Sequence, residues 1–398
     1  MLTFGAFPGQ FWIKWASFAL KMNVSKPSSI LFIDQYSSMG GGQVVLLELI
    51  ATSLDSALSV SLLCPLGGNL EAEILKRFGK RIELINLWQP PLTVGKKNWR
   101  DFFLMIAYSI YFFKFYNLIK RHRKIFVNGG RLFFPVALIS IFLKRYFFYF
   151  VHLDHSKIEK KIIQWILKLK NTSAVFTTSE FVFDRLFNFL PNLFKQKSKL
   201  KILQSCLSRR FSKAVFKDKF LKEIEPSRVV VIGRVSPEKG QDIIFRIASH
   251  LENVEFHIVG SFDFAKPDFF NNLKQNRAAN IFFHEHTTNI QDFVDSNEIQ
   301  YSLVPSVWEE PFGLVAIESM SMSLITIVRA SGGLLEISNK TGALTFKSDE
   351  DLITLMNQLF KKSKKDLISL SRQQFENVTS IYSPENFERN FQTMVLDI

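Results

Sequence analysis

Several common signals are scarce in this chain of 398 residues. It has only two cysteines, Cys64 and Cys206, and they are not spaced like a pair of metal ligands, which excludes a disulfide framework and favours a reducing cytosol. Its 42 phenylalanines greatly outnumber its 8 tyrosines and 6 tryptophans. Most aromatic side chains therefore have no polar group and favour a core or a lipid surface.

Long uninterrupted apolar runs are also lacking. Residues 1–20 are interrupted by Pro8, Gly9 and Lys14, and they have neither a basic leading region nor a small-residue cleavage site. Residues 102–113 are too few to cross a bilayer, and residues 132–151 are interrupted by two basic side chains. We expect no signal peptide and no membrane span, but a buried helix at 102–113 and a helix plus a strand at 132–151. Interfacial contact, and anchoring through residues 1–28, stay open.

Familiar cofactor-binding and metal-binding strings are missing as well. The glycine-rich loop at residues 40–42 matches neither Gly-x-Gly-x-x-Gly nor Gly-x4-Gly-Lys-Ser/Thr, which argues against a dinucleotide enzyme or an NTPase. The only Asp-x-Asp string, Asp349 to Asp351, begins a predicted helix and is interpreted as a helix cap. We expect neither a metal nor a resident cofactor.

Positive charge is abundant and unevenly distributed. Residues 1–225 contain 34 Lys and Arg against 14 Asp and Glu, a net charge of +20, whereas residues 226–398 have a net charge of −6. An anionic partner, either a membrane surface or nucleic acid, is therefore expected for the first half only. The alternative is a basic half that merely keeps the protein soluble.

The hydrophobic pattern predicts two open α/β domains. With 47% hydrophobic and 22% charged residues the chain can form packed cores, and its length favours two domains. Apolar runs alternate with helical stretches, which is typical of parallel sheets covered by helices. The predicted strands are residues 29–34, 59–63, 82–87, 125–128, 146–152 and 174–178, then 228–232, 255–259, 280–283, 301–305, 325–328 and 343–346. A polar, basic segment that ends at Pro226 places the boundary at 225/226.

Residues 304–320 form the strongest site candidate. A strand and a turn lead to a helix predicted to start near Phe312, with Glu310 just before the helix and Glu318 inside it. The backbone N–H groups at the helix start are suited to a diphosphate, and two carboxylates beside them suit a ligand that is also polyhydroxylated. These N–H groups belong to Phe312, Gly313 and Leu314. The alternative is that Glu310 complements the helix dipole and Glu318 is solvated.

A second segment, residues 229–242, would complete an anion site. A hydrophobic strand ends at Gly233 and Arg234, and Lys239 precedes the next helix. Because ligands of open α/β sheets bind at the carboxyl ends of strands, Arg234 and Lys239 are predicted to face a phosphate at the edge that carries Glu310. Alone, each cation would be interpreted as an ordinary surface residue.

Together these motifs resemble a known family. Residues 229–345 are similar to the carboxyl-terminal half of retaining, GT-B-fold glycosyltransferases of the glycosyltransferase 4, or group 1, type. The matching strings are Gly-Arg-x5-Gly at 233–240, Val259-Gly260, Pro305-Ser306, Glu310-x7-Glu318 and Ser331-Gly-Gly-x-x-Glu-Ile337. Over residues 30–205 the match is weaker and rests on the glycine loop, Val151-His152 and Thr178-Ser179-Glu180.

The resemblance implies an architecture. It consists of two Rossmann-like, doubly wound domains that face each other across a cleft. The acceptor would bind to residues 1–225 and the nucleotide-sugar to residues 226–382, while a terminal helix at 383–398 would pack back onto the first domain.

The resemblance also implies roles for single residues. Arg234 and Lys239 would contact the donor diphosphate beside Gly233, Glu318 the ribose hydroxyls, and Glu310 the hydroxyls of the transferred sugar. The loop at Gly41 and Gly42 would cover the phosphates from the opposite domain. His152 would lie against the sugar, with His155 as a rival for that role.

Two strings depart from the family pattern. Gln204 to Ser208 replaces the usual Asn-Gly-Val-Asp, and residues 321–326 replace a helix end in Ala-Gly-x-Pro. Both lie outside the predicted diphosphate site of Arg234 and Lys239, so they affect the connection between the domains and details of donor contact more than the class.

The expected function is metal-independent, retaining transfer from a UDP- or GDP-sugar to a glycan or lipid-linked acceptor. Cell-surface polysaccharide or lipopolysaccharide synthesis, by a cytoplasmic protein bound peripherally to the inner face of the membrane, follows as an expectation. One alternative is a GT-B sugar-nucleotide epimerase or a phosphorylase-like enzyme. Another is a basic nucleic-acid- or membrane-binding protein, but no recognition helix or RNP-like strand supports nucleic acid.

Overall fold

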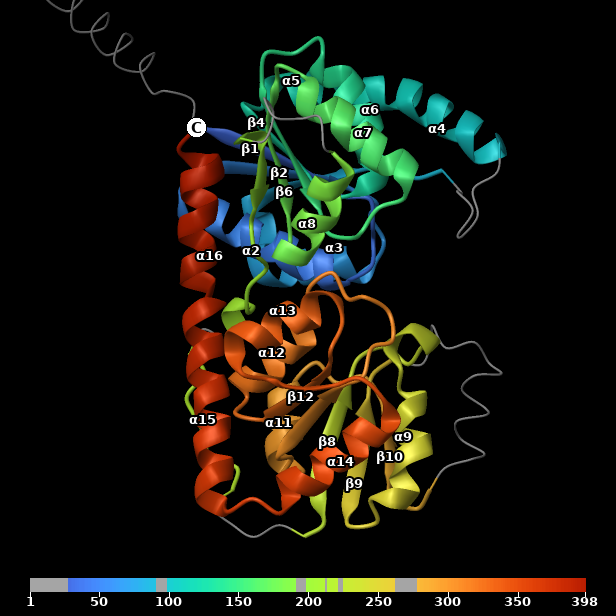
Figure 1. The fold of residues 1–398 in the computed structure, drawn as a ribbon. Helices are drawn as coiled ribbons and strands as arrows, with labels where there is room; N and C mark the ends of the chain where they lie inside the picture. The colour runs from blue at the N-terminus through green and yellow to red at the C-terminus, as the bar shows by residue number, and fades with distance from the viewer. Residues whose placement is uncertain (1–27, 91–98, 191–197, 212, 221–224, 262–277) are drawn as a thin grey trace, which may run out of the picture. The chain divides into compact units, whose positions relative to one another are not determined.

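The computed structural model describes residues 28–90, 99–190, 198–211, 213–220, 225–261 and 278–398 (Figure 1). The described residues form two compact units. Unit 1 contains residues 28–38, 50–148 and 170–173, and unit 2 contains residues 39–49, 149–169 and 174–398. The domain boundary at 225/226 stays a prediction. Residues 1–20, for which neither a signal peptide nor a span was expected, lie outside the described residues.

The first sheet has seven strands in the order β3-β2-β1-β4-β5-β6-β7. Six of them confirm the predicted strands, and β7 was missed because it is three residues long and lies in the basic segment. The strands are β1 Ser29–Ile33, β2 Ser59–Cys64, β3 Ile82–Asn86, β4 Lys124–Val127, β5 Tyr146–Val151, β6 Thr172–Thr177 and β7 Leu200–Ile202. The helices that alternate with them are α2 Gly41–Asp55, α3 Asn69–Phe78, α4 Trp99–Phe112, α5 Tyr116–Arg121, α6 Gly130–Ser140, α7 Lys157–Lys168 and α8 Glu180–Phe189.

The second sheet has six strands in the order β10-β9-β8-β11-β12-β13, all close to their predicted positions. The strands are β8 Ser227–Ile232, β9 Val254–Val259, β10 Ile281–His284, β11 Tyr301–Val304, β12 Ile325–Arg329 and β13 Leu344–Phe346. The helices are α9 Asp242–Ile247, α11 Ile290–Ser296, α12 Leu314–Ser321, α13 Gly332–Thr341, α14 Asp349–Phe360, α15 Lys364–Ile381 and α16 Pro384–Phe391. All pairings in this sheet are parallel, which confirms the α/β class.

Burial on both faces explains why the centre of β8 is an apolar run. In β8, Val229 and Val231 join a core cluster with α9 and α14, whereas Val230 joins a second cluster with α12 and α13. Successive side chains of a strand point to opposite faces, so a strand covered by helices on both sides cannot alternate with polar residues. β8 therefore carries its polar residues only at its beginning, outside this apolar run.

The helix α4 corrects one expectation. Residues 102–113 do form a helix, but it is not buried: Tyr108 and Phe112 are covered, whereas Ile106, Ile110 and Phe113 are 40%, 69% and 41% exposed. Positions 106, 110 and 113 share one helix face, and the Phe113 ring lies 6.3 Å from that of Phe142, which is 66% exposed. We call Ile106, Ile110, Phe113, Ile141 and Phe142 the apolar patch of unit 1. Among the described helices, none combines the length and hydropathy needed to span a bilayer.

Candidate functional site

The loop between β11 and α12, residues 305–313, carries the central candidate. α12 begins at Leu314, two residues later than predicted from the sequence, so the first-turn amides are those of Leu314 and Val315. Gly313 has a φ of +120°, and a Cβ atom there would lie 2.5 Å from Leu334 Cδ2. This position therefore requires glycine. Phe312 is buried, with its ring 5.4 Å from that of Tyr382.

Glu310 is held by two side chains. Glu310 is only 7% exposed. Its Oε1 atom accepts a hydrogen bond of 2.6 Å from Ser306 Oγ and forms an ion pair with Lys239 Nζ, also at 2.6 Å. The ammonium group of Lys239 also lies 5.8 Å from the ring centre of Trp308. The predicted neighbours Lys239 and Glu310 are therefore in direct contact, 71 residues apart in the chain.

Arg234 lies at the carboxyl end of β8, as predicted. It follows Gly233, whose φ is +141°, and its guanidinium is half exposed, 3.7 Å from Glu238 Oε1. A Cβ atom on Gly260, at the end of the neighbouring β9, would lie only 1.8 Å from the Gly233 carbonyl oxygen. The backbones of the two strand ends therefore lie so close together that position 260 has no room for a side chain.

Glu318 lies within α12 and has a partner of its own. Arg210 Nη2 is 2.8 Å from Glu318 Oε1. Burial raises the pKa of Glu318, although Arg210 acts in the opposite direction. A cavity of about 320 Å³ opens beside Arg210 and is lined also by Asn289 and Met322. Glu310 and Glu318 are thus each paired with a different cation.

The glycine loop at residues 40–42 leads into α2, which already starts at Gly41. A Cβ atom on Gly41 would lie 3.4 Å from Leu314 Cδ1, and one on Gly42 would lie 3.4 Å from the His152 ring. These are contact distances, so a larger side chain at either position would press on its neighbour. The structure therefore brings the start of α2, the start of α12 and His152 together within unit 2.

The two candidate histidines have different surroundings. Burial, reinforced by the nearby His155, lowers the pKa of His152 to about 3, so this ring is neutral near pH 7. Its ring centre lies 4.2 Å from that of Phe150. His155 Nδ1 instead lies 3.5 Å from the carboxylate of Glu159, which belongs to the capping box of α7. Of the two, His152 is the one that borders the glycine loop.

Metal-ligand clusters are not found in the part of the chain that the structure describes. Asp349 to Asp351 begin α14, with Ser348 Oγ accepting from the Asp351 amide, which confirms the cap interpretation.

Three side chains of the site were not predicted: Ser306, Arg210 and Ser179. Ser179 Oγ donates a hydrogen bond of 2.5 Å to the Pro311 carbonyl, which places the start of α8 against the loop 305–313. Ser306 and Ser179 belong to two of the motifs named above, Pro305-Ser306 and Thr178-Ser179-Glu180. Their places in these motifs are the sequence signal that could have identified them. Arg210 makes its contact across 108 residues, and no local pattern predicts that.

Comparisons with known proteins point to one enzyme class. A family model described as glycosyl transferases group 1 matches residues 212–374. No curated protein matches the chain. Among solved structures, HepE of Anabaena in complex with UDP and glucose is 16% identical, with a TM-score of 0.74, and the match covers 93% of this chain and 100% of that chain.

Two further structures have the same architecture. A glycosyltransferase from Rickettsia africae is 16% identical with a TM-score of 0.71, covering 92% of this chain and 98% of that chain. The lipopolysaccharide outer core galactosyltransferase WaaB is 14% identical with a TM-score of 0.65, covering 93% and 99%. At these identities the likeness establishes the fold, which is two Rossmann-like parallel-sheet domains of the GT-B type. Residues 212–374 therefore form a group 1 glycosyltransferase domain, and the chain is a glycosyltransferase with the GT-B fold.

Proposed function

We propose that this glycosyltransferase transfers a sugar, with retention of configuration and without a metal, from a nucleoside-diphosphate sugar to a glycan or lipid-linked acceptor of the cell surface. The contact between Lys239 and Glu310, 2.6 Å long and next to the start of α12, is the observation that carries the proposal. It puts a cation, a carboxylate and free backbone donors in one place, as a phosphorylated and hydroxylated ligand needs.

The helix α12 supports an extended nucleotide. Its start offers amides for the diphosphate, Glu318 lies one turn further for the ribose, and the cavity beside Met322 follows for the base. Eight residues of α-helix span about 12 Å, roughly the length of a nucleoside diphosphate. The HepE structures contain UDP, glucose and UDP-glucose, which favours a UDP-sugar over a GDP-sugar as the first donor to test.

The charges of the site suit a leaving diphosphate. Negative charge would develop on the diphosphate as the transition state acquires oxocarbenium character, and Arg234 and Lys239 would neutralise it together with the α12 amides. Glu310 would then hold the sugar hydroxyls. Neutral His152, beside Gly42, would donate or accept a hydrogen bond at the sugar without adding charge.

The acceptor is proposed to reside on an anionic membrane. The first half of the chain is strongly basic, and unit 1 carries the apolar patch with Ile110 and Phe142 more than 60% exposed. Apolar side chains beside basic ones are typical of surfaces that enter a lipid interface. The WaaB match, a lipopolysaccharide outer core galactosyltransferase, favours a cell-surface glycan as the acceptor.

The test is donor turnover. The protein is incubated with a panel of UDP- and GDP-sugars in EDTA, and released nucleoside diphosphate is measured with and without lipid-linked acceptors. Lys239→Ala and Glu310→Gln should each lower kcat/KM at least a hundredfold, whereas the control Arg228→Ala, which removes a cation paired with Glu255 at the opposite end of β8, should not. Unchanged activity in both site variants, or binding of no donor, would overturn the proposal.

A further inference from the structure

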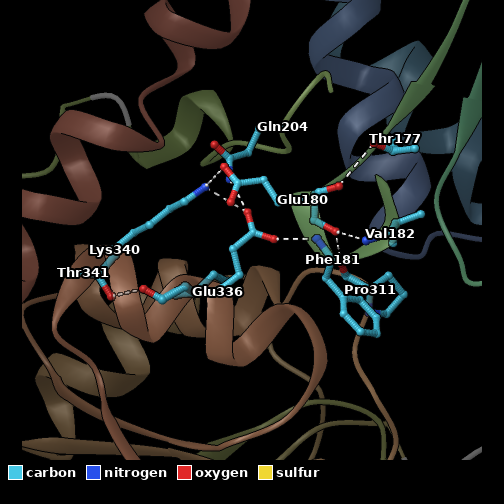
Figure 2. Close-up of polar contacts among 11 residues, drawn as sticks. Thr177, Glu180, Phe181, Val182, Gln204, Pro311, Glu336, Lys340 and Thr341 are labelled. Carbon is cyan, nitrogen blue, oxygen red and sulfur yellow. Dashed lines mark hydrogen bonds and ion pairs between the residues drawn. The ribbon is translucent and has the colours of Figure 1, made fainter. Parts of the chain in front are cut away.

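Glu336 on α13 lies at the centre of a cluster of hydrogen bonds in unit 2 (Figure 2). Its Oε2 atom accepts from the Phe181 amide at 3.0 Å, and its Oε1 atom accepts from Gln204 Nε2 at 2.8 Å and from Lys340 Nζ at 3.0 Å. The Glu336 side chain is only 8% exposed. Both oxygens of one buried carboxylate are thus used by donors from three places in the chain.

The Phe181 amide belongs to the first turn of α8, where it has no acceptor within the helix. Glu336 therefore completes the cap that Ser179 begins, because Ser179 Oγ accepts from the Val182 amide at 3.1 Å. A carboxylate at a helix start also complements the helix dipole. This contact fastens α8 to α13.

The same helix start is fastened to the loop 305–313. Ser179 is fully buried, and its hydroxyl donates to the Pro311 carbonyl at 2.5 Å. Arg185, one turn further along α8, adds an ion pair of 2.6 Å to Glu309, but both side chains are about half exposed. The buried hydroxyl is therefore the stronger attachment of the two.

α13 holds the other side of that loop. The Gly333 amide donates to the Glu310 carbonyl at 2.7 Å, and a Cβ atom on Gly332 would lie 2.7 Å from the same oxygen. Gly332 has a φ of +53°, so the close approach of α13 to the loop depends on glycine there.

The contacts form a closed ring, from Glu310 through Gly333 and α13 to Glu336, then through Phe181 and Ser179 to Pro311. We propose that Glu336 and Ser179 are positioning residues, which fix the backbone of Glu310 through this ring. The inference rests on the proposed function, in which Glu310 holds the transferred sugar. Buried hydrogen bonds of this kind are costly to leave unmade, so opening the ring at one point loosens the rest.

The carboxylate and the exposed ion pair can be separated experimentally. Lys340 also pairs with Glu180 at 2.8 Å, and the Glu180 side chain is 55% exposed. Glu336→Gln and Glu180→Gln therefore make the same chemical change at the same lysine, but only the first removes an acceptor from the ring. Glu180→Gln is the matched control.

Amide hydrogen exchange tests the ring of contacts in the absence of any nucleotide-sugar. In Glu336→Gln we expect the Gly333 amide, which Glu336 does not contact, to exchange about tenfold faster, with no change in Glu180→Gln. Ser179→Ala should have the same effect from the other side of the loop, and the double variant should add little to the larger single effect. If only the Phe181 amide becomes faster, Glu336 is a simple helix cap and the inference is overturned. Ser179→Ala alone decides if Glu336→Gln does not fold.

Ligand binding gives a second readout. Under the inference, Glu336→Gln weakens UDP-glucose about tenfold but leaves UDP unchanged, because only the contact to the sugar is disturbed. Equal weakening of both ligands overturns the positioning role. A wild-type protein that binds no nucleotide-sugar overturns the proposed function instead, while the exchange experiment still decides on the ring.

Discussion

Arg210 and Glu318 form an ion pair of 2.8 Å that joins the segment before β8 to the middle of α12. The carboxylate proposed to bind ribose is therefore already engaged by a cation. A ribose that donates two hydrogen bonds to Glu318 must share it with Arg210 or displace it.

The first prediction concerns this pair. Burial raises the pKa of Glu318 and Arg210 opposes the rise, so Arg210→Ala should raise the pKa further. The ionised carboxylate is the better acceptor for ribose hydroxyls, so UDP affinity in Arg210→Ala should increase as the pH rises from 5 to 8, more steeply than in the wild type. Titration calorimetry at several pH values measures this. A pH dependence identical to that of the wild type would contradict the prediction.

The second prediction concerns His152. Because its native pKa is about 3 and an unfolded histidine titrates near 6.5, the unfolded state binds the extra proton first. Stability from this residue is complete above pH 6.5 and is lost as the pH falls towards 3, by up to about 1.4 kcal/mol per pH unit. Urea unfolding of His152→Gln should show a shallower loss between pH 6.5 and 4 than the wild type. His286→Gln, which removes an exposed histidine, is the control, and an unchanged slope in His152→Gln would refute the prediction.

A third prediction tests the close approach of β8 and β9. Gly260→Ala should destabilise the protein by roughly 2–4 kcal/mol, because its Cβ atom would lie 1.8 Å from the Gly233 carbonyl. Gly40→Ala should cost less, since its Cβ atom meets only the end of the flexible Gln43 side chain, at 3.1 Å. Thermal unfolding of both variants compares them. Equal changes in Tm would show that the strand ends can move apart freely.

The fourth prediction concerns the apolar patch of unit 1. Replacing Ile110 and Phe142 together by serine should reduce sedimentation with anionic vesicles at least fivefold in 0.3 M salt, where charge attraction is screened and apolar insertion persists. Ile158→Ser provides the control, because Ile158 is 71% exposed in unit 2. Equal loss of binding in the control would mean that the patch has no special role.

Local patterns were sufficient to predict most of the sheets and part of the site. In β8, for example, the apolar run Val229 to Ile232 is followed directly by Gly233. The apolar run and the glycine can both be recognised in a short stretch of sequence. Lys239 and Glu310 were predicted to lie at the same edge of the sheet because both follow strands whose carboxyl ends share that edge, and the structure adds a direct contact between them. Topology therefore brought them together without any side-chain information.

Contacts that depend on packing were not predictable. Helix periodicity shows that residues 106, 110 and 113 share a face but not whether anything covers it, so α4 was expected to be buried. Arg210 and Ser179 contact residues more than a hundred positions away, and neither contact leaves a local trace. The start of α12 was placed two residues early, because the left-handed geometry of Gly313 delays it.

The composition of unit 2 has a consequence for the order of events during synthesis. Residues 39–49, which include the glycine loop, leave the ribosome more than a hundred residues before most of the segments against which they pack. Glu48 in this stretch bonds to Ser208 and Arg209, and Arg209 in turn reaches Glu388 on α16. Contacts of such long range form late and slowly, so the glycine loop should acquire its native position only after α16 has been made.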